Sequence, residues 1–245
     1  MRGDMKRNLI CFLLLFYFNL FNADLFCSKA NNTDSRFIQQ LYHMIKCISD
    51  TLQQRHITHW WIGGTLLGAV RHAGIIPWDT DADCCMFVED ANLLPEINRE
   101  MQKFGYLIIQ KTWNRFKILP KKDLQMLGVI KDVNEILPIL SVSIVDCDKI
   151  MNSIVKQKRP YIDIYLSVKH GDKISHRVNP TDPIYFLVDE LFPLKKYRFG
   201  EMNDLLGPNN PHGYLERAYG KNYMTHGQNG KPLNEIFINW FPVIF

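Results

Sequence analysis

Three carboxylates stand at alternate positions in one short stretch of the chain. They are Asp79, Asp81 and Asp83, and the apolar run Cys84–Val88 follows them directly. In an extended strand, residues two positions apart point to the same side. Two like charges about 4 Å apart repel each other by about 4 kcal/mol at an effective dielectric of about 20. Such a cluster therefore needs a cation, raised pKa values or full hydration.

Ligands that offer only oxygen atoms suit a hard divalent cation, so this cluster favours Mg²⁺ or Mn²⁺ over zinc. A hydrated acidic turn and a structural Ca²⁺ loop are the alternatives. The residues after the aspartates are more apolar than a surface loop would be. We therefore predict a catalytic metal ion at this cluster of aspartates.

A glycine-rich turn precedes this cluster. The bulky run His59–Ile62 predicts a strand, and Gly63 and Gly64 end it and let the backbone approach a ligand closely. The next residues predict a helix with Thr65 as its N-cap, and a helix N-terminus suits a phosphate. We expect Gly63, Gly64 and Thr65 to bind the phosphates of a ligand. Arg71 is a candidate counter-charge, although an arginine at this helix end could equally face solvent.

One more carboxylate lies inside an apolar run. Asp163 belongs to the predicted strand Arg159–Val168, where an unpaired charge would be costly. An ion pair with Arg159 or Lys158 would satisfy it. We favour the alternative, in which Asp163 is the third carboxylate of the metal site. Asp146 and Asp148 are rivals for that role, at the end of a predicted strand over residues 141–146.

The remaining elements must position these side chains. Apolar residues at helical spacing predict a helix over residues 34–56, behind the glycine turn. Residues 91–104 predict a second helix, and residues 105–110 and 113–119 a hairpin of two strands. The stretch 128–140 reads as an irregular connection. A short strand pair is expected at 190–194 and 197–200, followed by a packing helix that ends at Gly220.

The first thirty residues form a separate unit. Three basic residues precede an apolar run of 13 residues, Leu9–Phe21, which is nearer a signal-peptide core than a membrane span. Residues 1–30 are therefore expected to be a cleaved signal peptide or a short signal anchor, with residues 31–245 as one catalytic domain. The domain would lie in the ER or Golgi lumen or be secreted, with membrane attachment only through an anchor. Asn31 begins a glycosylation sequon.

Charge and cysteine content exclude several other classes of function. The 245 residues carry a net charge of +4, and removal of residues 1–30 would take away four basic and two acidic residues. The remaining charge gives no indication of nucleic-acid binding. No cysteine spacing matches a zinc ribbon or a redox pair. Cys84 and Cys85 are expected to be buried thiols.

The run Gly-Thr-Leu-Leu-Gly-Ala-Val-Arg, followed by Ile-Ile-Pro-Trp-Asp-x-Asp-x-Asp, closely resembles the LicD family of phosphotransferases. That family includes bacterial phosphocholine transferases and animal fukutin-related proteins. The resemblance implies an α/β (α+β) fold with a nucleotidyltransferase-like mixed sheet flanked by helices. It also implies a CDP-linked alcohol donor, such as CDP-choline or CDP-ribitol, and a glycan acceptor. The metal would then be held by Asp81, Asp83 and a later strand aspartate, which matches Asp163.

Two other functions share these motifs. An enzyme of the same fold could transfer a nucleotide from a nucleoside triphosphate and release pyrophosphate. A secreted binding protein could keep the fold without turnover, although the presence of all three candidate carboxylates weighs against this.

Overall fold

The computed structural model describes residues 35–176 and 182–226. The expected leader and the sequon at Asn31 lie outside the described residues. Within the described parts of the chain, no helix is both long enough and apolar enough to cross a membrane.

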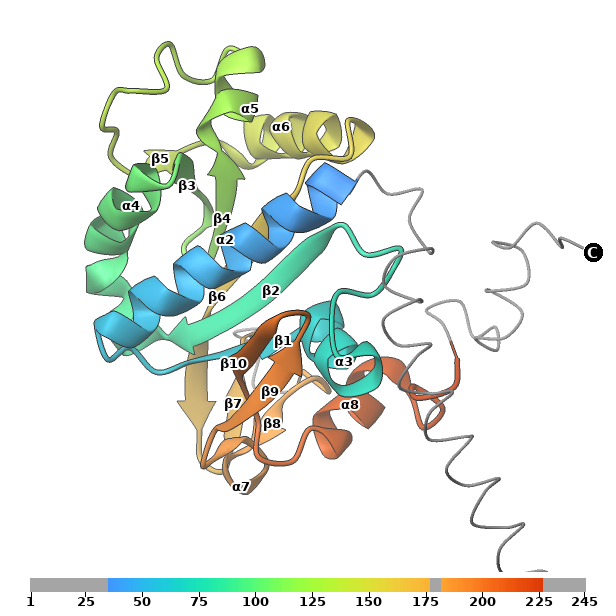
Figure 1. The fold of residues 1–245 in the computed structure, drawn as a ribbon. Helices are drawn as coiled ribbons and strands as arrows, with labels where there is room; N and C mark the ends of the chain where they lie inside the picture. The colour runs from blue at the N-terminus through green and yellow to red at the C-terminus, as the bar shows by residue number, and fades with distance from the viewer. Residues whose placement is uncertain (1–34, 177–181, 227–245) are drawn as a thin grey trace, which may run out of the picture.

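A mixed sheet of eight strands carries the fold (Figure 1), and a separate pair of strands lies beside it. The main path of the sheet runs β1-β2-β6-β4-β3-β5, with β7 paired to β6 and to β8. Strands β2 and β6 are parallel, and β6 is antiparallel to β4 on its other side. The bounds of the strands are β1 His59–Ile62, β2 Asp81–Phe87, β3 Tyr106–Thr112, β4 Arg115–Pro120, β5 Leu140–Ser141, β6 Tyr161–His170, β7 Lys173–Ser175, β8 Phe186–Leu187, β9 Lys195–Phe199 and β10 Met202–Gly207.

Helices cover both faces of this sheet, so the expected fold class is confirmed. Their bounds are α2 Ser35–Gln54, α3 Gly63–His72, α4 Leu94–Lys103, α5 Lys121–Met126, α6 Ile144–Lys156, α7 Val188–Leu191 and α8 His212–Tyr219, with a 3-10 turn η1 at Val88–Leu93.

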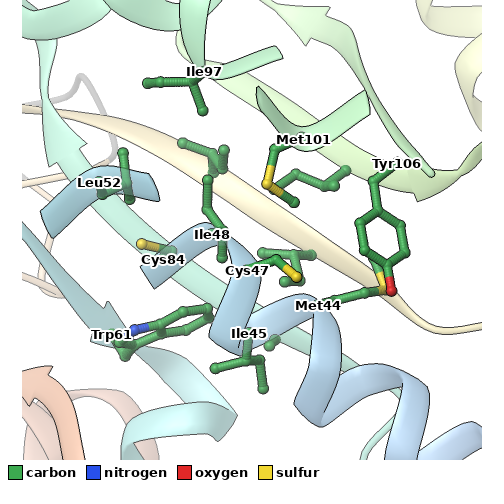
Figure 2. Packing of buried hydrophobic residues seen from close by; sticks show 14 of the residues in the cluster. Met44, Ile45, Cys47, Ile48, Leu52, Trp61, Cys84, Ile97, Met101 and Tyr106 are labelled. Atoms are coloured by element: carbon green, nitrogen blue, oxygen red, sulfur yellow. The ribbon is translucent and has the colours of Figure 1, made fainter. Parts of the chain in front are cut away.

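Helix α2 packs across one face of the sheet, as its apolar spacing predicts. Met44, Ile45 and Ile48 meet side chains from β1, β2 and α4 (Figure 2). On the sheet, Trp61 and Cys84 point into this layer. The four cysteines at positions 47, 84, 85 and 147 are all buried free thiols, which confirms the expectation for Cys84 and Cys85.

Alternation along three adjacent strands decides which side chains reach the opposite face. On β2, β6 and β4, the residues Ala82, Cys84, Ile162, Ile164, Phe116 and Ile118 belong to the α2 layer. Their neighbours in sequence therefore point to the other face. On that face lie Asp81 and Asp83 from β2, Asp163 from β6, and Arg115 and Lys117 from β4. These five charged residues therefore share one face of three adjacent strands.

Two predicted elements are wrong. The strand predicted over residues 141–146 is absent beyond Ser141, the last residue of β5, because Ser143 caps helix α6 and its hydroxyl accepts the Asp146 N–H at 3.0 Å. The apolar residues Cys147, Ile150, Met151 and Ile154 then continue at helical spacing against β3.

The second error concerns the expected strand at 190–194. Its first residues lie in the short helix α7, and the strand pair consists instead of β9 with β10. The helix before Gly220 is confirmed as α8, with Gly220 at its C-cap at a φ of 82°.

Candidate active site

Asp81, Asp83 and Asp163 converge on one point of the sheet. Each offers one carboxylate oxygen, and these oxygens all lie within 4.8 Å of one another. The register explains this convergence, because Asp83 and Asp163 are paired residues on the parallel strands β2 and β6. Asp81 lies two residues before Asp83, on the same face. The rivals lie elsewhere: Asp146 is in the first turn of α6, and Asp148 pairs with Lys111 at 2.7 Å.

The cluster carries an electrostatic cost that a cation would relieve. Burial, then the charges of Asp81, Asp163 and Asp79, raises the pKa of Asp83 well above its ordinary value. Burial and the neighbouring Asp81 raise the pKa of Asp79 to about 7. Carboxylate oxygens in this arrangement are the ligands that Mg²⁺ and Mn²⁺ prefer. The residues present therefore fit a divalent ion held by the three converging aspartates.

Two cations that sequence analysis missed already neutralise part of this cluster. The Nζ of Lys117 lies 2.6 Å from Oδ1 of Asp163, and Nη2 of Arg115 lies 2.7 Å from Oδ2. Arg159, one of the two partners that the alternative interpretation gave Asp163, instead has its Nε 3.6 Å from Oδ1 of Asp123. Lys117 is the register partner of Asp163 across β4 and β6. No sequence signal could have paired them, since 46 residues separate the two in the chain.

The glycine turn lies directly against the acidic residues. A Cβ atom added to Gly63 would lie 2.6 Å from Oδ2 of Asp83, and one added to Gly64 would collide with Oδ2 of Asp79. Gly63 also has a φ of 59°, which side-chained residues rarely adopt. Glycine at these two positions therefore leaves room for the carboxylates.

The structure changes the roles expected for the turn residues. Helix α3 begins at Gly63, and Ile62 is its N-cap without a side-chain hydrogen bond, so Thr65 is not the cap. The Thr65 hydroxyl instead accepts the Asp83 N–H at 3.0 Å and ties the helix to β2. The Gly63 N–H donates to the Tyr214 hydroxyl at 3.2 Å.

Arg71 lies at the other end of α3, away from the N-terminus that faces the acidic residues. Its Nη1 donates to the carbonyls of Tyr223 at 2.6 Å and His226 at 2.9 Å. These bonds hold the segment after α8 against α3. The expected counter-charge for a phosphate is therefore engaged with backbone carbonyls.

Tyrosine side chains line the same face of the sheet. Tyr161 is the register partner of Asp81, and its ring lies 4.6 Å from Lys117 Nζ. The Tyr165 ring lies 4.9 Å from the guanidinium carbon of Arg115. Burial, followed by the nearby aspartates, raises the pKa of both phenols, so both hydroxyls stay protonated.

Comparison with known proteins connects this geometry to a family. Residues 56–129 match the family model described as LicD/FKTN/FKRP, nucleotidyltransferase domain. The match covers the glycine turn, Asp81, Asp83 and strand β4, and Asp163 lies beyond it. Over 53 residues, 22% of this chain and 11% of that protein, the chain is 38% identical to human ribitol 5-phosphate transferase FKRP.

A longer similarity extends to a bacterial protein. An uncharacterized protein of Rickettsia prowazekii is 32% identical over 180 residues, which is 73% of this chain and 53% of that protein. The chain thus spans about half the length of this relative. Among solved structures, ANT(2″)-Ia in complex with adenylyl-2″-tobramycin matches with a TM-score of 0.43 and 12% identity, covering 81% of this chain and 84% of that one. Lincosamide antibiotic adenylyltransferase LnuA matches with a TM-score of 0.39 and 14% identity, covering 71% and 82%.

The residues that carry the sequence resemblance are thus the ones that build the turn and the β2 side of the acidic cluster. The family-model match and the partial similarity to FKRP support membership of the LicD family, and the matched segment is residues 56–129.

Proposed function

We propose that the protein is a metal-dependent phosphotransferase that moves a phospho-alcohol from a CDP-linked donor to a hydroxyl of a glycan. The observation that carries the proposal is the convergence of Asp81, Asp83 and Asp163, whose oxygens lie within 4.8 Å of one another beside the N-terminus of α3. The 53-residue similarity to FKRP, a ribitol 5-phosphate transferase, supports the choice of donor class. The presence of all three carboxylates favours an enzyme over a binding protein.

Two groups of residues in the site have different proposed ligands: the aspartates would bind the metal ion, and the N-terminal turn of α3 would bind phosphate. Asp81, Asp83 and Asp163 would hold Mg²⁺ or Mn²⁺, which when bound supplies positive charge for the oxygens of the donor diphosphate. The N-terminal turn of α3, which begins at Gly63, offers N–H groups and the positive end of the helix dipole. Because Gly64 and Thr65 follow in that turn, they are the proposed phosphate-binding positions of the backbone.

The proposed reaction is a displacement at the phosphorus that bears the alcohol. The acceptor hydroxyl oxygen forms a new bond to this phosphorus, and its proton passes to a carboxylate of the acidic cluster, for which Asp163 is the proposed candidate. The bond from phosphorus to the oxygen bridging it to the nucleotide breaks, and CMP leaves. The phospho-alcohol remains on the glycan. Work in the secretory route, as the first thirty residues suggest, would bring the enzyme to such glycans.

The test is to incubate the purified full chain with Mn²⁺ and a panel of CDP-alcohols that includes CDP-choline and CDP-ribitol. Release of CMP, together with a raised unfolding temperature in the presence of one donor, is the expected result. Pyrophosphate release from a nucleoside triphosphate would indicate nucleotidyl transfer instead. Binding of Mn²⁺ without product from any nucleotide donor would indicate a binding protein.

A further inference from the structure

The Asp163 carboxylate has two cationic partners, both from strand β4. Oδ1 accepts from Lys117 Nζ at 2.6 Å and from Arg115 Nε at 3.4 Å, and Oδ2 accepts from Arg115 Nη2 at 2.7 Å. Arg115 thus donates two hydrogen bonds to the carboxylate, one from Nε and one from Nη2. Guanidinium groups bind phosphates with the same paired geometry. Both oxygens of this candidate metal ligand are therefore already in contact with cations.

The two cations differ in how freely they could leave. The Lys117 side chain is 4% exposed, and the Tyr161 ring covers its Nζ at 4.6 Å. The Arg115 side chain is 34% exposed, although Asp163 itself is 1% exposed. Lys117 is thus enclosed with its carboxylate, while Arg115 reaches it from the solvent side.

Charge at the site favours a movement of Arg115 when metal and donor bind. A divalent ion held by Asp163 competes with the guanidinium for the same carboxylate. A donor diphosphate then brings new negative charge to a site that already contains four aspartates, including Asp79. Arg71 is engaged with the carbonyls of Tyr223 and His226, so a cationic side chain that adds to the charge of the metal would be another residue.

We propose that Arg115 is a phosphate-binding residue of the donor site, which passes from Asp163 to the donor diphosphate when a divalent ion binds that carboxylate. Lys117 stays in place and keeps the Asp163 carboxylate oriented. The inference rests on the proposed function, because it assumes a metal ion and a diphosphate at the aspartates. Beyond that function, the inference assigns Arg115 to binding of the diphosphate. It also couples donor binding to metal binding, because the metal ion releases Arg115 from Asp163.

The test compares the full chain with Arg115→Gln and Arg115→Lys, and uses Arg55→Gln as the matched control. Arg55 is a half-buried arginine, 27% exposed, that pairs with Glu96 and Glu100 of α4. Helix α4 packs in the α2 layer, on the opposite face of the sheet from the aspartates. Mn²⁺ affinity is measured from the electron paramagnetic resonance signal of free Mn²⁺. Affinities for CDP and CMP are then measured by calorimetry at saturating Mn²⁺.

We expect Arg115→Gln to bind Mn²⁺ at least as tightly as the unaltered chain, because a competing cation is gone. Its affinity for CDP should fall about 10- to 100-fold, as expected for a lost charge-assisted hydrogen bond, while CMP affinity changes less. Arg115→Lys keeps the charge and loses the paired geometry, so its CDP affinity should be intermediate. Arg55→Gln should match the unaltered chain throughout.

Two results would overturn the inference while leaving the proposed function intact. One is CDP affinity in Arg115→Gln equal to that of the unaltered chain. The other is weakened Mn²⁺ binding in both Arg115 variants, which would show that Arg115 serves to hold Asp163 for the metal. If the unaltered chain binds neither Mn²⁺ nor CDP, the proposed function fails and the inference fails with it.

Discussion

Asp83 on β2 and Asp163 on β6 are direct register partners on neighbouring parallel strands. The next strand, β4, places Lys117 opposite Asp163 in turn. Two carboxylates and an ammonium group therefore form one row across three strands, on the face turned away from α2. The ammonium group of Lys117 therefore offsets part of the repulsion between the two carboxylates.

Replacement of Asp83 by Asn should have opposite effects on stability and on function. In the metal-free protein, the substitution removes a carboxylate whose pKa is raised by burial and then by Asp81. The free energy of unfolding should therefore rise, on the order of 1 kcal/mol. Turnover should fall by at least about 10²–10³, since an electrostatic stabiliser of the reaction is lost. Asp81→Asn should lose turnover in the same way.

Urea unfolding with EDTA and CMP release with Mn²⁺ check both effects of these substitutions. Full activity in either asparagine variant would remove that residue from the site.

Substitution of Gly63 by Ala tests whether the turn makes room for the acidic residues. The new Cβ would meet Oδ2 of Asp83 at 2.6 Å and would sit at a φ of 59°. We expect a loss of stability above the 1–2 kcal/mol or so that a left-handed backbone alone costs. Mn²⁺ affinity should fall as well, because Asp83 must move.

Gly105→Ala is the matched control for this substitution. Gly105 has a φ of 84° and no atom within 4 Å of the added Cβ, so only the backbone cost applies there. Equal losses of stability in the two variants, measured by urea unfolding, would show that contact with Asp83 contributes nothing.

Lys117→Met should destabilise the fold even without metal. The substitution removes the most enclosed cation of the site and leaves Asp163 with Arg115 alone. Breaking a buried ion pair costs about 3–5 kcal/mol, and the remaining arginine should keep the loss near the lower end. The double variant Lys117→Met with Asp163→Asn should recover part of it. A double variant as unstable as the sum of the two single ones would show no coupling between these side chains.

The stability of the fold should depend on His72 at mildly acidic pH. Burial, followed by the neighbouring Arg71, lowers the pKa of His72 from 6.5 to about 4. Between these values the unfolded chain binds a proton that the folded chain does not. Protonation of the unfolded chain at His72 therefore leaves the free energy of unfolding unchanged above pH 6.5. Below that, it lowers the free energy of unfolding as the pH falls toward 4, by up to about 1.4 kcal/mol per pH unit.

His72→Gln removes this titration and should flatten the dependence. Chemical denaturation at several pH values between 4 and 7 measures it. An unchanged slope in the variant would place the titrating group elsewhere.

The sequence predicted the parts of the site that lie close together in the chain. Alternation placed Asp81 and Asp83 on one face of a strand, and the apolar run around Asp163 predicted the strand that became β6. Both patterns are local and depend only on the backbone period. That Asp163 meets the other two depends on strand pairing, which the resemblance to a family implied and composition could not.

The features of the site that the sequence did not predict depend mostly on contacts between segments that are far apart in the chain. Arg115 and Lys117 reach Asp163 because β4 pairs with β6. These two strands are far apart in the chain, and no local pattern predicts that they are neighbours in the sheet. The sequence left Arg71 as a candidate phosphate ligand, but its guanidinium group donates to a carbonyl of the segment after α8. The strand predicted at 141–146 failed for a local reason, since the Ser143 cap outweighed the run of β-branched residues around Ile144.

The claim that Asp81, Asp83 and Asp163 together hold a divalent ion has one direct measurement. Mn²⁺ is titrated into the metal-free full chain and into its three single Asp→Asn variants, and free Mn²⁺ is followed by electron paramagnetic resonance. We predict stoichiometric binding of Mn²⁺ by the unaltered chain and a large loss of Mn²⁺ affinity in every variant. Absence of binding to the unaltered chain, or undiminished binding to Asp163→Asn, would contradict it.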